Sequence, residues 1–330
     1  LILIKAFLLL SLVSYSTARS SKAFRPESKH RRFRDSDLDK EISKVEAELD
    51  SDPDTDKAII SLELADKIYE DDWAQDLKDK KISTQGIEEF DYTDDSQSAM
   101  RIGYATKGDT LFVIFRGSKN PTNAITDIKI HTVKQTEAFW GFKKDVELHK
   151  GFFQAIFDNV VSINLKLKAY KSKKFKNVVF AGHSLGGALA ELGFLYARNM
   201  NNKLTNKIFD NPNYYIFTFG CPRVGNKPYA ETFQGFSDLK YHIRFTIEED
   251  LVPMAMDQPY LHAGTEINIT DLKKKEFEVK EFNTDQTKRE ISLEQNPSKL
   301  KIAAKLLSYI VKKTVMPTDK KLTEKIKDHR

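Results

Sequence analysis

One serine of this chain lies in a sequence pattern that suits nucleophilic attack. Residues 180–190 read Phe-Ala-Gly-His-Ser-Leu-Gly-Gly-Ala-Leu-Ala, so Gly182, Ser184 and Gly186 form a G-x-S-x-G pattern. An expected strand precedes the serine and an expected helix follows it, which is the setting this pattern requires. A serine at so sharp a turn is strained, and a Cβ two residues away on either side would collide with neighbouring chain. A serine that merely caps the helix is the alternative, but the context favours a nucleophile that attacks a carbonyl carbon.

A serine hydroxyl needs a histidine to take its proton and a buried carboxylate to orient that histidine. Asp250 follows the expected strand 241–247 and precedes Leu-Val-Pro. It should therefore emerge at the same sheet edge as Ser184, since the carboxyl ends of parallel strands share one edge. Glu248 and Glu249 are the competing carboxylates, and we interpret them as solvated neighbours.

The elements that must position these residues alternate along the chain. Short apolar runs predict buried strands, and longer amphipathic runs predict helices between them. The expected strands are 111–115, 177–181, 214–219 and 241–247, and the expected helices are 151–170, 185–200 and 227–236. This alternation predicts an α/β fold with a mostly parallel central sheet and helices on both faces.

Composition narrows the class of protein. The 330 residues include 53 basic and 48 acidic ones, a net charge of 53 − 48 = +5, and 40% are hydrophobic. A globular chain with so small a basic excess is not expected to bind nucleic acid. The single cysteine, Cys221, can form neither a disulfide framework nor a zinc cage, and we expect it to be a buried filler. The sequence implies no metal and no cofactor, and it shows no Gly-rich phosphate loop.

The N-terminal region predicts two segments that precede the main domain. Residues 1–18 are apolar apart from Lys5 and end in small residues, which is typical of a secretory signal peptide. Residues 19–55 are dense in charge and predict a pro-segment, with a basic processing site at 31–34, or a solvated linker. The remaining residues, 56–330, suit one large domain. Because no Met precedes Leu1, we expect a sequence truncated at its start.

The last part of the chain predicts a cationic amphipathic helix. Apolar residues recur at helical spacing from Leu300 to Val311 among several lysines. Such a helix could lie on an anionic lipid surface. We favour packing against the core.

Six short segments, in order, make the chain resemble the fungal-type (class 3) triacylglycerol lipases of the α/β-hydrolase superfamily. The resemblance covers roughly residues 101–270 and the last three residues. The segments are Val113 to Ser118, His149 to Phe152, Gly182 to Gly187, Phe219 to Asn226, Asp250 to Pro253, and His262 to Glu266. Together they are specific, whereas any one of them alone would not be.

The resemblance assigns roles to individual residues. Ser184 is the nucleophile and Asp250 matches the acidic position of the family's triad. Two of the seven histidines, His262 and His329, follow Asp250. His329, which follows an aspartate as the family's catalytic histidine does, is the expected base, and the domain is expected to be truncated after it. His262 lies in a stretch that the family does not use as the base, and it is the alternative.

The resemblance also implies an oxyanion hole and a lid. The backbone N–H of Leu185, the residue after the nucleophile, is the expected first donor, and Ser118 is the expected second. Residues 119–142 match the place of the family's lid, and their mixed polar and apolar character suits a segment that opens onto lipid. A packed surface helix is the alternative. Asn268-Ile-Thr270 is a glycosylation sequon within an expected strand.

These observations predict a secreted serine esterase. It would hydrolyse acylglycerol or related lipid ester bonds through an acyl-enzyme at a lipid–water interface, with no nucleic acid and no obligate protein partner. It would reside outside the cell or in the lumen of a secretory or digestive compartment. A phospholipase A1 or a feruloyl-type esterase of the same fold is the first alternative. A non-catalytic lipid-binding relative is the second.

Overall fold

The computed structural model places the predicted strands in one large sheet. It describes residues 53–70, 86–95, 100–118, 132–135, 140–142, 144–247, 250–254, 256, 259–271, 276–281, 289–290 and 297–314. The predicted signal peptide, most of the charged segment 19–55, and His329 lie outside the described residues. Among the described residues, no helix has both the length and the apolar character required to cross a bilayer.

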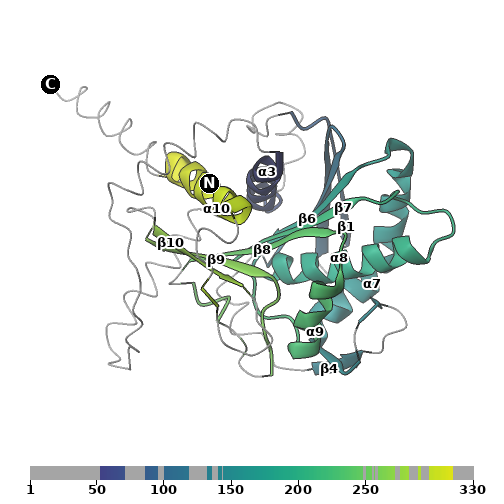
Figure 1. Cartoon of the computed structure of the whole chain (residues 1–330). Helices are drawn as coiled ribbons and strands as arrows, with labels where there is room; N and C mark the ends of the chain where they lie inside the picture. Colours follow the sequence, from purple (N-terminus) through teal and green to yellow (C-terminus); the bar gives the residue numbers. More distant parts are fainter. Residues whose placement is uncertain are drawn as a thin grey trace.

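The sheet has nine strands in the order β1-β2-β3-β6-β7-β8-β9-β10-β11 (Figure 1). The strands are β1 Glu89–Asp95, β2 Met100–Lys107, β3 Thr110–Phe115, β6 Asn177–His183, β7 Asn213–Phe219, β8 Leu239–Ile247, β9 Thr265–Asp271, β10 Glu276–Glu281 and β11 Arg289–Glu290. Strands β3, β6, β7, β8 and β9 are parallel to one another, whereas the pairs at both edges are antiparallel. This mostly parallel sheet confirms the predicted α/β class.

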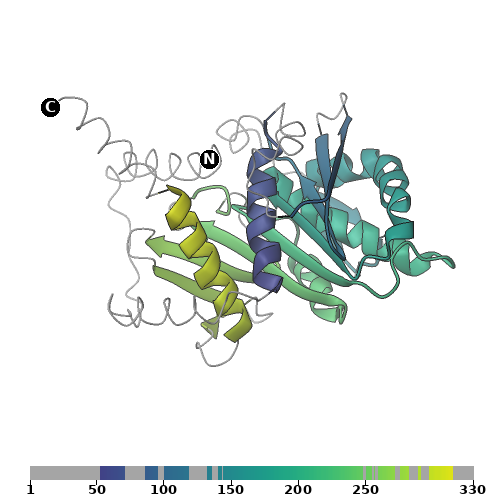
Figure 2. The ribbon, with the colours of Figure 1, turned by 90° about the horizontal axis from the view of Figure 1, so that it is seen from above.

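Helices cover both faces of this sheet, as Figure 2 shows from above. They are α3 Pro53–Lys67, α7 Lys150–Ala169, α8 Leu185–Lys203, α9 Lys227–Thr232 and α10 Pro297–Thr314, with short 3-10 turns η1 Lys171–Lys173 and η2 Phe233–Gly235. One core lies between the sheet and α7, α8 and α9, and a second lies between the sheet and α3 and α10. Because helices cover both faces, β3, β6 and β7 are mostly apolar rather than alternating. Strand β8 does alternate, but its polar residues His242, Arg244 and Thr246 are buried as well.

The C-terminal helix packs on the core, as predicted. In α10, Ile302, Leu306 and Ile310 are buried in the second core, where they meet the apolar side of α3. Lys299, Lys301 and Lys305 are half-buried, and Lys305 pairs with Asp56 at 3.4 Å. The alternative, that this helix lies on a lipid surface, would expose the side chains that the structure buries.

The segment expected to be a lid is only partly described. Residues 119–131 lie outside the described residues. Thr132–Gln135 forms β4, which pairs antiparallel with β5, Val146–His149, in a separate two-stranded sheet. Trp140 and Phe142 are buried in the first core and stack on each other, with ring centroids 5.9 Å apart. The prediction that the apolar side chains up to 142 cover the site is therefore wrong for Trp140 and Phe142, which the core holds.

Candidate active site

The candidate nucleophile lies at the carboxyl end of β6, on the turn that opens α8. Ser184 has φ +55° and ψ −128°, the left-handed strain expected of the pattern, and its backbone N–H donates to the carbonyl of Phe219 at 2.9 Å. This turn is possible because the flanking residues, Gly182 and Gly186, have no side chain. A Cβ on Gly182 would lie 2.2 Å from the carbonyl oxygen of Gly186, and one on Gly186 would lie 2.1 Å from that of Phe115. Both positions therefore require glycine.

The predicted oxyanion donors flank this turn. Leu185 begins α8, and the N–H groups of a first helical turn have no acceptor within the helix. The helix dipole also makes the N-terminus of α8 positive, which favours a negative charge beside Leu185. Ser118 follows β3, which pairs parallel to β6 with Phe115 opposite Gly182, so Ser118 and Leu185 leave the sheet at the same edge. The Ser118 side chain is half-buried.

Tyr69 ties the loop before Ser118 to the nucleophile turn. Its hydroxyl accepts the N–H of Gly117 at 3.1 Å and lies 3.1 Å from Nδ1 of His183. Burial lowers the pKa of His183 to about 3, so the ring is neutral and Nδ1 can accept a hydrogen bond from the hydroxyl. The Tyr69 hydroxyl thus links Gly117, which precedes Ser118, to His183, which precedes Ser184. The sequence patterns gave no sign of Tyr69, which lies 48 residues before Gly117.

We predict that Tyr69→Phe lowers kcat by about tenfold and the free energy of unfolding by about 1–3 kcal/mol, because Gly117 N–H loses its buried acceptor. The measurements are steady-state kinetics on a soluble ester and urea unfolding. KM should stay nearly unchanged, since the substituted group positions the loop rather than binding the substrate. Tyr196→Phe is the matched control, since that hydroxyl bonds to Asn164 between α7 and α8. An equal loss of kcat in both variants would contradict the assigned role.

Asp250 lies at the same edge, three residues after β8. Its side chain is buried, with 5% of the residue exposed, and one carboxylate oxygen accepts the N–H of Val252 at 2.9 Å. Burial raises the pKa of Asp250 to about 6, and the hydrogen bond from Val252 offsets only part of this rise. A carboxylate in this environment is stabilised by a proton donor that approaches it.

The described histidines have other contacts. His262 bonds through Nε2 to the carbonyl of Pro253 at 2.8 Å, so it fastens the loop that follows Asp250. His149 caps α7, where Nδ1 accepts the N–H of Phe152 at 3.4 Å. His242 pairs with Glu191 at 3.0 Å in the core. His183 binds Tyr69 as described above. The strand pairing therefore places Ser184, Leu185, Ser118 and Asp250 at the same edge of the sheet, while His329 lies outside the described residues.

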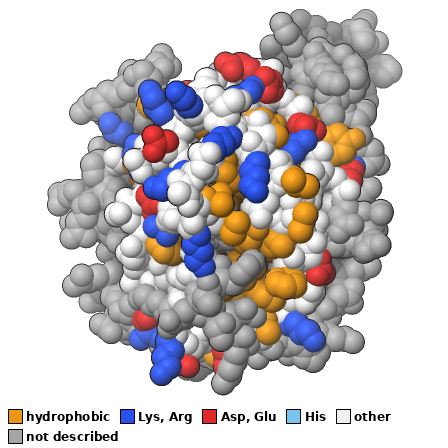
Figure 3. Space-filling model, turned by 90° about the vertical axis from the view of Figure 1, so that its right-hand side faces the viewer, with side chains coloured by type: hydrophobic (Ala, Val, Ile, Leu, Met, Phe, Trp, Pro, Cys, Tyr) orange, Lys and Arg blue, Asp and Glu red, His pale blue; other side chains and the backbone are white. Residues whose placement is uncertain are grey.

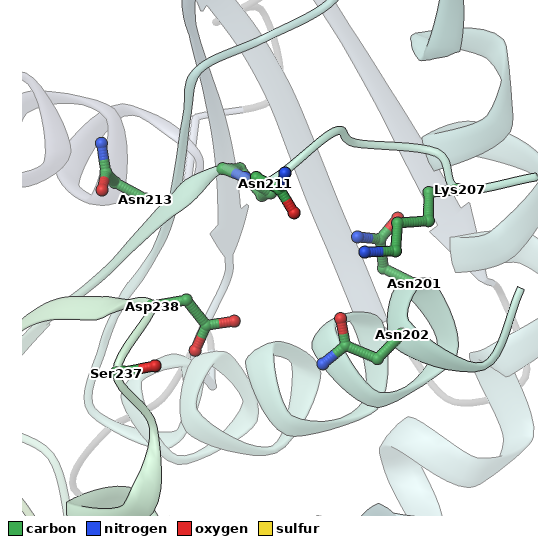
Figure 4. Close-up of a pocket in the computed structure, with 8 residues that line it drawn as sticks. Asn201, Asn202, Lys207, Asn211, Asn213, Ser237 and Asp238 are labelled. Carbon is green, nitrogen blue, oxygen red and sulfur yellow. The ribbon is translucent and has the colours of Figure 1, made fainter.

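A polar pocket on the opposite edge of the sheet offers no comparable chemistry. It lies where α8 ends and β7 and β8 begin, with Asn201 and Asp238 in its wall (Figure 4). The Asn201 amide is occupied by the backbone of Ile208 and Phe209, and both carboxylate oxygens of Asp238 accept from Arg198 at 2.8 and 3.0 Å. In the described ranges no cluster of His, Cys, Asp and Glu could hold a metal ion.

Known structures share the arrangement of sheet and helices described above. A triacylglycerol lipase whose catalytic centre is formed by a serine-protease triad superimposes with a TM-score of 0.54 at 23% identity, over 65% of this chain and 79% of that one. The Rhizomucor miehei triacylglyceride lipase does so with a TM-score of 0.51 at 22% identity, over 71% and 82%. The chain therefore has the α/β-hydrolase fold.

Sequence comparison finds similarity to one group of lipases. The sequence model of the class 3 lipases matches residues 112–259. The lipase of Rhizopus niveus is 31% identical over 175 residues, which are 50% of this chain and 40% of the relative. The lipase of Rhizomucor miehei is 32% identical over 168 residues, 49% and 42% of the two chains. Over this region the chain is similar to class 3 lipases, and its matching part spans about 40% of the length of these relatives.

Proposed function

We propose that this chain is a serine hydrolase that cleaves carboxylic ester bonds of lipids through an acyl-enzyme on Ser184. The observation that carries the proposal is the strained Ser184 turn between β6 and α8. Asp250 and Ser118 leave the sheet at the same edge, which is the spatial order that a Ser, His and Asp triad with an oxyanion hole requires.

The proposed reaction has two halves. Oγ of Ser184 attacks the ester carbonyl carbon while His329 takes the hydroxyl proton. The tetrahedral oxyanion accepts hydrogen bonds from Leu185 N–H and from Ser118. The bond to the alcohol oxygen then breaks, and His329 gives its proton to that oxygen. Water attacks the acyl-enzyme in the same way, with His329 again as base, and releases the fatty acid and free Ser184.

The environment of Asp250 supports a histidine partner from outside the described residues. Within the described part of the chain, no histidine bonds to this buried carboxylate, and burial raises its pKa to about 6. An imidazole that donates Nδ1–H to Asp250 would stabilise the ionised form, and the ionised form would in turn stabilise the imidazolium that forms during attack. We assign this role to His329.

We predict that His329→Ala makes stability depend on pH. In this variant only burial and the Val252 hydrogen bond act on Asp250, so its folded-state pKa is about 6, against 3.8 unfolded, and between these values the folded state holds a proton that the unfolded state has released. The free energy of unfolding should therefore fall as pH rises from about 4 to 6, by up to about 3 kcal/mol. Urea unfolding across this range is the measurement. The parent protein should lose less over the same range, and identical pH curves would contradict the pairing.

Substrate class follows from the surroundings of the site and from the relatives. Leu251 and Met254, close to Asp250 in the sequence, expose 51% and 62% of their surface, so apolar side chains are exposed near the candidate site. The related proteins include lipases and the phospholipase A1-IIgamma of Arabidopsis thaliana, which is 25% identical over 175 residues. We infer a lipid ester substrate, with acylglycerols first and phospholipids as the alternative.

Hydrolysis rates on three substrates test this assignment. We expect faster release of fatty acid from emulsified triglyceride than from phosphatidylcholine. A phospholipase A1 would reverse this order, and an esterase of the feruloyl type would act mainly on an aryl ester. A non-catalytic lipid-binding relative would hydrolyse none of the three, which would overturn the proposed function.

We also propose that the chain is secreted. The apolar segment 1–18 has the form of a signal peptide, and one relative, from Fusarium solani, is a secreted mono- and diacylglycerol lipase, 32% identical over 145 residues. Release of active protein into the culture medium by the natural leader, and its retention when residues 1–18 are deleted, is the corresponding test.

A further inference from the structure

Helix α7 presents an apolar stripe to solvent. Its inner side, including Ile156 and Ile163, is buried against the first core. Its outer side carries Phe157, Val161 and Leu165, which expose 46%, 66% and 65% of their surface. We call these three residues the α7 stripe. They are spaced by four, so they follow one line along the helix, and they are half of the six large apolar side chains that the described part of the chain exposes.

Lysines flank the α7 stripe along the chain, most of them on its C-terminal side. Between residues 150 and 176 the chain has seven lysines and one acidic residue, Asp158, which gives a net charge of 7 − 1 = +6. Acidic residues from neighbouring elements pair with three of these lysines, namely Asp91 with Lys166, Glu89 with Lys173 and Asp109 with Lys176. Within the described residues, no carboxylate pairs with Lys150, Lys168, Lys171 or Lys174. Figure 3 shows apolar side chains interspersed with basic ones on this side of the molecule.

The apolar stripe and the nearby lysines together indicate which kind of partner α7 could bind. A second copy of the same face would bring two sets of lysines together, and like charges disfavour that contact. An anionic bilayer surface accepts both features, since apolar side chains enter the boundary between headgroups and acyl chains while lysines meet the phosphate and carboxylate groups. We propose that the α7 face is a docking surface for anionic lipid membranes.

The docking surface is separate from the candidate active site. Helix α7 ends where β6 begins, at the edge of the sheet opposite Ser184, and Lys176 there donates its N–H to Asp109 and precedes β6. The lysines of the last turn and of η1 therefore lie at that opposite edge. A chain held by α7 would lie with its strands along the membrane and would leave the Ser184 edge facing sideways, so docking and ester cleavage can be measured separately.

A local fluorescent probe tests the docking. Cys221, the only cysteine, is fully buried, so an environment-sensitive thiol dye on Val161→Cys reports on α7 alone. The same dye on Gln234→Cys, an exposed residue of η2, is the control. Both are made in the full chain with Ser184→Ala, so that hydrolysis of the vesicles does not affect the readout and a failure of the proposed function leaves the result intact.

With vesicles of phosphatidylcholine and phosphatidylserine, the dye at 161 should shift to the blue and the dye at 234 should not. Lys168→Gln should weaken the titration about fivefold, whereas Lys227→Gln, which removes the same charge on α9, should leave it unchanged. No shift at position 161, or an equal shift with phosphatidylcholine alone, would overturn the proposal. So would a dimer in solution that Leu165→Ser dissociates, because a second copy would then occupy the face.

Discussion

Replacing Ser184 by alanine is expected to lower the rate of ester hydrolysis by roughly 10⁴-fold or more. The substitution removes the only atom that forms the acyl bond, and a triad without its nucleophile retains little beyond substrate binding and the oxyanion donors. The measurement is kcat on a soluble aryl ester, with thermal unfolding to show that the fold is intact.

The fold should tolerate this change, because the Ser184 side chain makes no capping hydrogen bond to α8 and the turn is held by backbone contacts. Ser118→Ala provides a graded comparison. It keeps the backbone N–H of residue 118, so its loss of rate should be far smaller than that of Ser184→Ala. Comparable losses in the two variants, or retained activity in Ser184→Ala, would contradict the assignment of the nucleophile.

The second large effect is expected for Asp250→Asn, which should lower kcat by about 10⁴-fold. An amide in place of the carboxylate neither holds the histidine in the correct tautomer nor stabilises the imidazolium. The burial of Asp250 and the hydrogen bond from Val252 fix its position, so the loss should be in kcat rather than in KM. Steady-state kinetics on the same soluble ester is the measurement.

The neighbouring carboxylates provide the control. Glu248→Gln and Glu249→Gln each remove one negative charge next to Asp250 in the sequence. Each should change kcat by less than about threefold, because we expect both carboxylates to be solvated and solvated charges contribute little. A large loss in either of these variants, with Asp250→Asn nearly unchanged, would move the acid of the proposed triad to that residue.

Much of this fold follows from local sequence signals. Strands β3, β6 and β7 are mostly continuous apolar runs because helices cover both sheet faces. The G-x-S-x-G pattern marks a turn that requires glycine at positions 182 and 186. These signals lie within a few residues of one another. The sequence therefore predicted the Ser184 turn, and with it the sheet edge at which Asp250 and Ser118 emerge.

Other features could not be predicted because distant residues decide them. Helix α3 has a charged sequence, yet Asp54 is buried where Lys57, Lys240 and the Tyr215 hydroxyl bind its carboxylate. A single sequence gives no sign that these partners meet. The contact of Tyr69 with Gly117 and His183 is equally distant along the chain.

The apolar spacing of the segment after Ser118 did not indicate what its side chains pack against. The apolar residues in 119–142 are compatible both with a lid that opens onto lipid and with a helix that packs on the protein surface. Trp140 and Phe142 turn out to be core residues, since they pack beside Tyr196 and Tyr229 under α7 and α8. Spacing identifies an apolar side, whereas the partner of that side is set by the tertiary fold.

The proposal depends on the reactivity of Ser184, and covalent labelling tests it directly. The full chain is treated with a fluorophosphonate ester, which reacts with activated serines by displacing fluoride, and the modified peptide is located by mass spectrometry. We predict one adduct per chain on Ser184, loss of ester hydrolysis in proportion to labelling, and much slower labelling in His329→Ala. An active protein that carries the adduct on another residue, or that hydrolyses esters while Ser184 stays unmodified, would contradict the account.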